Sequence, residues 1–111
     1  MAPKLPNYLR MFRKRAYFTQ DEVSFLLGTV SGTRVSRYEQ FSREPGLETI
    51  LAYGVIFAVP PEQLFAGLYE RIEGKVKERA TELVRQLEAG RLGPVAEHKL
   101  GILREIIGRR H

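Results

Sequence analysis

The residues able to do chemistry gather between Ser31 and Gln40, and their chemistry is hydrogen bonding. The hydrogen-bonding side chains of this stretch include Thr33, Arg34, Ser36, Arg37 and Gln40. Only Val35 and Tyr38 are placed to face a hydrophobic core. A helix anchored by so few apolar residues presents most of its surface elsewhere. Arg, Ser, Thr and Gln are side chains that contact the base edges and phosphates of nucleic acid, so we expect a recognition surface here.

The rest of the sequence contains few of the residues and motifs that enzymes use for catalysis. The chain has no cysteine, which excludes disulfides, zinc–thiolate sites and thiol chemistry. Asp21 is the single aspartate, and the two histidines, His98 and His111, fall in or after the last expected helix. The sequence has no phosphate-binding glycine motif and no metal-ligand spacing. We therefore predict no catalytic site, no metal and no cofactor, with His98 on the surface of its helix.

The charge is basic and unevenly spread. The chain of 111 residues has a net charge of +5, and residues 1–18 alone carry five basic residues and no acidic one. This balance favours a polyanion, with nucleic acid first and an acidic membrane second, although a basic soluble protein without such a partner has the same composition. The apolar run from Ile50 to Val59 is too short to cross a bilayer, and we find no signal peptide, so we expect a cytoplasmic protein without a membrane partner.

Two short helices joined by a glycine turn are expected to position the recognition surface. Thr19 followed by Glu22 forms a capping-box pattern, which predicts a helix from there to about residue 27. Gly28 can take the left-handed conformation that ends a helix, and Ser31 is a candidate N-cap for the next one. The side chains of the first helix expected to face inward are Val23, Leu26 and Leu27.

The flanking segments also predict helices. Apolar residues at three- and four-residue spacing predict one over about 7–15. Pro45 marks a loop after the recognition helix, and the following helix should end before Pro60. Its expected apolar stripe is Leu47, Ile50, Leu51, Gly54 and Ala58. Pro61 suits the first turn of another helix, with Leu64 and Phe65 on its apolar side.

The C-terminal part predicts a helical hairpin. Apolar residues recur every three or four positions from Leu68 to Leu87, which predicts a long amphipathic helix ending near Gly90. A turn over 90–94 leads to a second helix, about 95–107, whose apolar face is Ala96, Leu100, Leu103 and Ile107. The two helices should pack antiparallel. We expect an all-α protein with one domain over residues 1–66 and a tail over 67–111 that packs or dimerises.

This pattern resembles the Cro/repressor-type, or Xre-like, helix-turn-helix domain, which has the lambda-repressor-like fold. The segments that carry the resemblance are Thr19–Val23, Leu27–Gly28, Val35–Glu39, Pro45–Leu51 and Glu62–Phe65. The resemblance covers about residues 7–66 and implies a five-helix domain. Its third helix, about residues 31–40, would enter the major groove of double-stranded DNA. The tail resembles no family that we recognise.

The resemblance also implies roles for single residues. Gln20 and Arg43 would contact phosphate, and Arg13 would form an internal ion pair with Glu39. The residues expected at base edges or the adjacent backbone are Gly32, Thr33, Ser36 and Arg37, with Arg34 and Gln40 nearby. Arg37 can donate two hydrogen bonds to a guanine, worth about 1–3 kcal/mol of discrimination, although a solvated surface arginine looks the same in sequence.

Three positions depart from the family pattern. Thr29 is an extra residue between the second and third helices, which lengthens the turn or tilts the third helix. Ser24 stands where a small alanine is usual, so its hydroxyl needs a partner. Gly32 stands where a long polar side chain is common, so either the backbone approaches DNA closely or the site reads fewer bases.

Two apolar residues, Phe25 and Val55, fall on faces expected to be solvated. Our hypothesis is that the tail or a second subunit covers one or both of them. Scattered exposed apolar residues, which are common on protein surfaces, are the alternative.

Two functions from different classes fit these observations. The first is a sequence-specific DNA-binding transcriptional regulator that acts as a homodimer on a two-fold-related operator, with the tail as the dimer element. The second is a protein-interaction module, such as the antitoxin of a toxin–antitoxin pair or a bridging cofactor, whose tail holds a protein partner. An antitoxin can also bind its own operator, so the two classes overlap.

Overall fold

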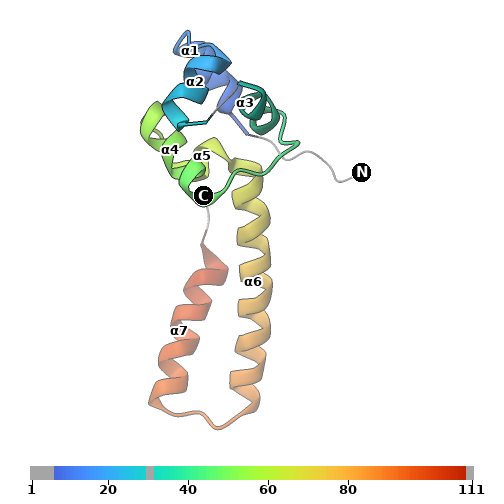
Figure 1. Ribbon diagram of the computed structural model, residues 1–111. Helices are drawn as coiled ribbons and strands as arrows, with labels where there is room; N and C mark the ends of the chain where they lie inside the picture. Colours follow the sequence, from blue (N-terminus) through green and yellow to red (C-terminus); the bar gives the residue numbers. More distant parts are fainter. Residues whose placement is uncertain (1–6, 30–31, 110–111) are drawn as a thin grey trace. The chain divides into compact units, whose positions relative to one another are not determined.

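The computed structural model describes residues 7–29 and 32–109, and within them it consists of helices without strands (Figure 1). The helices are α1 (Leu9–Arg15), α2 (Gln20–Leu27), α3 (Gly32–Glu39), α4 (Leu47–Phe57), α5 (Pro61–Leu64), α6 (Ala66–Ala89) and α7 (Pro94–Gly108). The predicted all-α class is confirmed for the residues that the structure describes.

The chain divides into two compact units. The first ends at Tyr69, and the second runs from Glu70 to His111. The boundary falls inside α6, because the first turn of this helix belongs to the first unit, where Leu68 is buried in the core. The division expected from the sequence falls after residue 66.

One hydrophobic core organises the first unit. Its buried members are Leu9, Val23, Val35, Tyr38, Tyr53, Leu64, Phe65 and Leu68. Every helix of the unit therefore supplies at least one of them. The Tyr53 ring contacts the rings of Tyr38, Phe57 and Phe65 at centroid distances of 6.3, 6.0 and 5.9 Å. Aromatic contacts of this kind bury large apolar areas, so this cluster fixes how α3 and α4 are placed in the unit.

The predicted apolar stripe of α4 was right at Ile50 but wrong at Leu47 and Leu51. Leu47 and Leu51 are 72% and 53% exposed, whereas Tyr53 is 1% exposed. Ile50 and Phe57 pack against the core beside Tyr53. These three residues follow helical spacing as well as the predicted set does, but the aromatic rings bury more apolar surface than the two leucines.

Two details of the N-terminal helices also differ from expectation. Helix α1 begins at Leu9, because Asn7 is engaged outside the helix: its Oδ1 accepts from the Leu9 N–H at 3.2 Å, and its Nδ2 donates to the Tyr38 carbonyl at 3.0 Å. In α2, Val23 is buried and Leu27 packs against the core as predicted, but Leu26 is 50% exposed. The inward position beside Val23 is taken by Ser24, which is 3% exposed.

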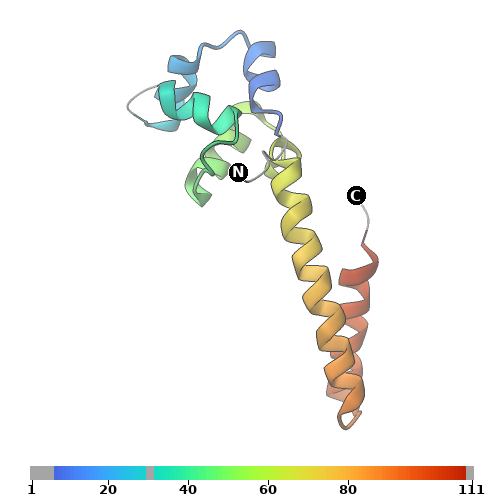
Figure 2. The same cartoon turned by 90° about the vertical axis from the view of Figure 1, so that its right-hand side faces the viewer.

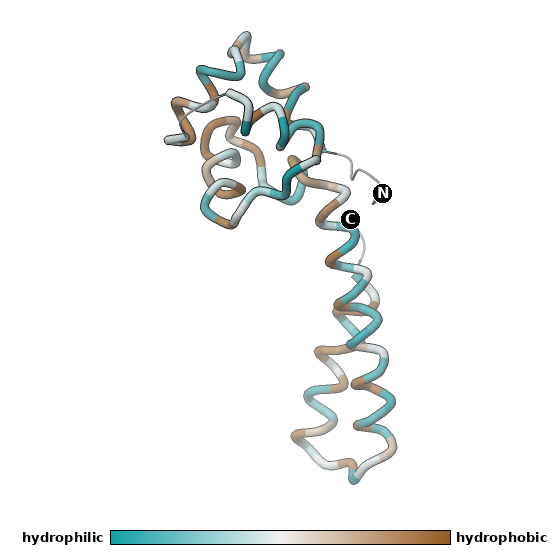
Figure 3. The backbone as a smooth tube through the Cα atoms, turned by 45° about the vertical axis from the view of Figure 1, so that its right-hand side comes forward, coloured by the Kyte–Doolittle hydropathy of each residue, from teal (hydrophilic) through white to brown (hydrophobic). Residues whose placement is uncertain are grey.

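The second unit is a helical hairpin, in which α7 runs antiparallel beside the rest of α6 (Figures 1 and 2). Arg104 Nη2 lies 3.4 Å from Glu88 Oε2, and Lys77 Nζ donates to the Arg109 carbonyl at 2.5 Å. The buried apolar residues of the hairpin are Ala80, Leu100 and Leu103. Figure 3 shows apolar and hydrophilic positions alternating along both helices, as the predicted amphipathic pattern requires.

Several apolar side chains of the hairpin remain open to solvent. Those at least 42% exposed are Ile72, Val76, Leu83, Leu92, Val95 and Ile102. In the first unit, Phe25 and Val55 are 83% and 82% exposed.

Within residues 7–29 and 32–109, no helix is both long enough and apolar enough to cross a membrane.

Candidate nucleic-acid interface

Helix α2 is capped at both ends by residues next to it in the sequence. Thr19 Oγ1 accepts from the Glu22 N–H at 3.0 Å, and Glu22 Oε1 accepts from the Thr19 N–H at 2.8 Å, so the predicted capping box is confirmed. Gly28 ends the helix with φ of +77°, a left-handed conformation that suits glycine. The Ser31 N-cap expected for the next helix lies outside the described residues.

Helix α3 is held by two large side chains, as its sequence predicts. Val35 and Tyr38 are 0% and 4% exposed, and both belong to the core. Thr33, Arg34 and Arg37 are exposed along the same eight-residue helix. Most of α3 therefore presents polar and cationic side chains to solvent or to a binding partner.

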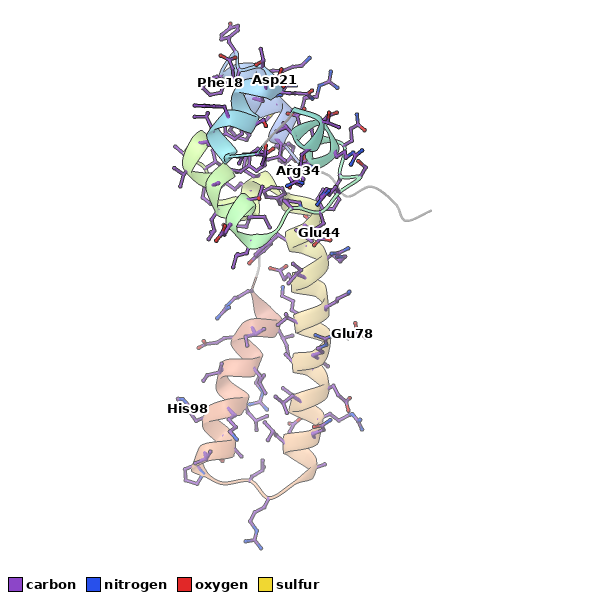
Figure 4. The ribbon with its side chains drawn as sticks, in the orientation of Figure 1. Phe18, Asp21, Arg34, Glu44, Glu78 and His98 are labelled. Carbon is purple, nitrogen blue, oxygen red and sulfur yellow. The ribbon has the colours of Figure 1, made fainter. Side chains whose placement is uncertain are left out.

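The first end of α3 borders a surface hollow that it shares with the start of α2. The lining residues are Thr19, Gln20, Asp21, Gly32, Thr33 and Ser36. Three predicted contact residues of α3 thus meet Gln20, the predicted phosphate contact of α2. Figure 4 labels Asp21 on α2 and Arg34 on α3. The hollow is lined by hydrogen-bonding groups, which suits a polar partner such as a base edge.

A second hollow lies beside the first and is shared by α1, α2 and the end of α3. Its lining residues are Arg10, Arg13, Gln20, Ser36, Glu39 and Gln40. Gln20 and Ser36 border both hollows. The predicted contact residues Gln20, Thr33, Ser36 and Gln40 therefore lie along one continuous polar surface.

A buried carboxylate organises this second hollow from beneath. Glu39, whose side chain is 4% exposed, accepts from Arg13 Nε at 2.5 Å and from Arg13 Nη2 at 3.2 Å. Gln20 Nε2 donates to the same carboxylate at 3.2 Å, and Arg13 Nη1 donates to the Phe18 carbonyl at 3.0 Å. The hydrogen bond to Glu39 raises the pKa of the Arg13 guanidinium above its ordinary value, as does the carboxylate charge, against the effect of burial. The pair fixes α1 against α3 and orients Gln20.

The cationic contact candidates lie outside the two hollows. Arg34, Arg37 and Arg43 are exposed and line neither of them. The Arg37 carbonyl accepts from the backbone N–H groups of Ser42 and Arg43 at 2.9 and 3.4 Å. This bonding ties the segment that carries Arg43 to the last turn of α3.

Gly32 is placed differently from the other predicted contact residues. It is buried, and its N–H donates to Asp21 Oδ1 at 3.2 Å. Sequence reasoning missed three residues that border the hollows: Arg10, Thr19 and Asp21. Arg10 lies in the basic N-terminal segment, three residues before Arg13. Asp21 follows Gln20 directly, but nothing local in the sequence pairs it with Gly32.

The described part of the chain contains no group of three or more His, Asp or Glu residues able to hold a metal ion. His98 is exposed on α7, as predicted, and His111 lies outside the described residues.

Comparison with protein families gives a match over the first unit. The Helix-turn-helix family, of the Xre or lambda-repressor-like type, matches residues 9–64, half of the chain. The matched region runs from the start of α1 to the end of α5. It supports a DNA-binding transcription regulator as the kind of function, in a family that is not typically enzymatic. Comparison with curated proteins and with solved structures gave no match.

Proposed function

The chain belongs to the Xre-like helix-turn-helix family, and on that premise we propose that it is a sequence-specific DNA-binding transcriptional regulator. In this proposal α3 lies in the major groove of double-stranded DNA. Thr33, Ser36 and Arg37 approach base edges, with Arg34 and Gln40 beside them. Gln20 and Arg43 contact the phosphates on either side. The proposed location of the regulator is the cytoplasm.

The observation that carries the proposal is the division of α3 into a buried and a polar face. Val35 and Tyr38 hold the helix to the core, while Thr33, Arg34 and Arg37 remain exposed. A helix placed in the major groove needs such a division, because base edges are read by side chains that the fold itself does not use. We add Arg10 as a phosphate contact, because it borders the same polar surface as Gln20.

We also propose that the regulator is a homodimer assembled through the hairpin. By itself the hairpin buries few apolar side chains and leaves Ile72, Val76, Leu83 and Ile102 between 42% and 48% exposed. Two such hairpins can bury these residues against one another as a four-helix bundle. A dimer would present two copies of α3 to half-sites one helical turn apart, which matches a two-fold-related operator.

Selection from a random double-stranded DNA pool tests the proposed DNA binding. The full chain should enrich a sequence with two related half-sites, and its affinity should fall as salt rises, because counterions are released from the phosphates. A pool that remains random after repeated rounds at low salt would reject sequence-specific binding.

Sedimentation of single variants tests the proposed dimer. Leu83→Glu places a charge on the exposed apolar face of the hairpin, so it should convert a dimer to a monomer at micromolar concentration. Glu78→Gln changes an exposed residue of the same helix and serves as the control. A wild-type chain that sediments as a monomer, or a Leu83→Glu variant that remains dimeric, would reject the hairpin as the dimer element.

The exposed face of the hairpin also favours a second candidate function, a protein-interaction module such as an antitoxin or a bridging cofactor. The exposed apolar residues of α6 and α7 would then contact a different protein. A monomeric chain that binds no DNA at low salt would favour this function over the first.

A further inference from the structure

The start of α3 is joined to α2 by a contact between Gly32 and Asp21. Asp21 Oδ1 accepts from the Gly32 N–H at 3.2 Å across eleven residues of sequence. The first N–H groups of a helix have no partner within the helix, and a carboxylate near them is favoured by the helix dipole. Asp21 therefore supplies α3 with a cap from a different helix.

The same carboxylate fills the space where a side chain at position 32 would begin. A Cβ atom added to Gly32 would lie 2.5 Å from Asp21 Oδ1 and 3.3 Å from the Asp21 backbone nitrogen. The first distance is shorter than non-bonded atoms tolerate, so a side chain at position 32 would displace the Asp21 carboxylate and break its hydrogen bond to the start of α3. Neither close approach of the backbone to DNA nor a loss of readout is needed to explain this glycine.

Asp21 is also open to a ligand. It is exposed and borders the polar hollow between the starts of α2 and α3, together with Thr33 and Ser36. Its Oδ1 is engaged with Gly32, and an ionised carboxylate has further lone pairs on both oxygens. The exocyclic amino groups of cytosine and adenine are the donors in the major groove, and a carboxylate pairs with cytosine N4, because the adenine amino group lies beside the N7 acceptor.

We propose that Asp21 supplies the reading side chain that Gly32 lacks: its carboxylate positions the start of α3 and accepts a hydrogen bond from a cytosine amino group. This inference rests on the proposed function, because it assumes that the polar surface of α3 meets a major groove. A carboxylate at this place also repels phosphate, so it favours one base at the cost of non-specific affinity.

Parallel selections with the wild type, Asp21→Asn and Glu78→Gln test the reading role. Asparagine keeps an acceptor for the Gly32 N–H but removes the negative charge, so α3 stays in place while the cytosine contact is altered. We expect the preference for cytosine at one position of each half-site to fall about fivefold or more, the size of one lost base contact, with the other positions unchanged. Glu78→Gln, the same chemical change on α6, should leave the motif intact.

The outcomes separate this inference from the proposed function. A wild-type chain that enriches no motif overturns both. A wild-type motif that Asp21→Asn reproduces at every position overturns the reading role of Asp21 alone.

Thermal unfolding of Gly32→Ala, Asp21→Ala and the double variant tests the positioning role without DNA. Alanine is ordinarily the better helix residue, so a destabilising Gly32→Ala substitution would be diagnostic of the clash. With Asp21 present, Gly32→Ala should lower the Tm, because it displaces the Asp21 carboxylate from the backbone N–H at position 32. With Asp21→Ala, the same substitution should leave the Tm unchanged or raise it. An equal effect in both backgrounds would overturn the positioning role.

Discussion

Ser24 Oγ lies 2.5 Å from Thr29 Oγ1 and 3.3 Å from the Thr29 carbonyl oxygen. Thr29 Oγ1 lies 3.3 Å from the Ser24 carbonyl oxygen, to which the Thr29 N–H also donates at 3.0 Å. The sequence predicts that both residues depart from the helix-turn-helix pattern, Ser24 as a serine in place of alanine and Thr29 as an additional residue. Thr29 therefore supplies the partner that the buried Ser24 hydroxyl needs.

This relationship predicts a non-additive pair of substitutions. Thr29→Val keeps the shape of the side chain but removes the hydroxyl, so it should lower the free energy of unfolding by about 1–3 kcal/mol by leaving Ser24 with a poorer partner. Ser24→Ala removes the group that needs the partner. The double variant, measured by urea unfolding, should therefore lose less stability than the sum of the single variants. Losses that simply add would show that the two hydroxyls are independent.

Removing one partner of the Arg13–Glu39 ion pair should lower the free energy of unfolding substantially. Arg13→Met leaves the nearly buried Glu39 carboxylate with Gln20 as its remaining side-chain partner, so we expect a loss of about 3 kcal/mol in the free energy of unfolding. The comparison variant is Arg85→Ala, which breaks an exposed pair with Glu82 and should change the Tm little. Equal effects of the two variants would contradict a structural role for Arg13.

Tyr53 predicts a stability change that depends on pH. Among the residues that the structure describes, its hydroxyl is buried without a hydrogen-bond partner, and burial raises its pKa above the ordinary value. A raised pKa in the folded state means that stability is fully present below the unfolded value, about 10, and is lost as pH rises above it. Tyr53→Phe should therefore be as stable as the wild type or more stable at pH 7, and should resist unfolding above pH 10 better. A Tyr53→Phe variant that unfolds at a lower pH than the wild type would contradict this account.

The end of α4 carries a residue that its backbone conformation does not favour. Ala58 has φ of +54° and ψ of +43° at the C-cap, a left-handed conformation in which a Cβ atom is strained. Ala58→Gly should raise the free energy of unfolding by about 0.5–1 kcal/mol. The matched control is Ala52→Gly inside α4, which should lower it by about 1 kcal/mol. A loss of stability at both positions would contradict strain at Ala58.

The fold was predictable where its signals are local. The capping box of Thr19 and Glu22, the glycine turn at Gly28 and the proline at the start of α5 each act within a few residues, so the sequence alone indicates where helices begin and end. The anchors of α3 were predictable for the same reason, since Val35 and Tyr38 stand out in a polar helix.

Other features depend on packing that no local pattern contains. Helix α4 is apolar on more than one side, so the choice between Leu51 and Tyr53 is decided by the aromatic cluster around Tyr53. The contact of Asp21 with Gly32 joins two helices through a turn, and the sequence shows only a missing side chain at position 32. Likewise, the sequence indicates that the Ser24 hydroxyl needs a hydrogen-bond partner, but only the folded turn identifies Thr29 as that partner.

The central claim, that α3 reads base sequence, is tested most directly by measuring binding to a selected DNA site and to a scrambled site over a range of salt concentrations. The wild type should bind the selected site about 10³-fold or more tightly than the scrambled one. Arg37→Ala should lose about 1–3 kcal/mol of binding free energy on the selected site, whereas Arg79→Ala, the same charge change on α6, should leave the preference intact. Equal affinity of the wild type for both sites at every salt concentration, or equal effects of the two substitutions, would contradict the claim.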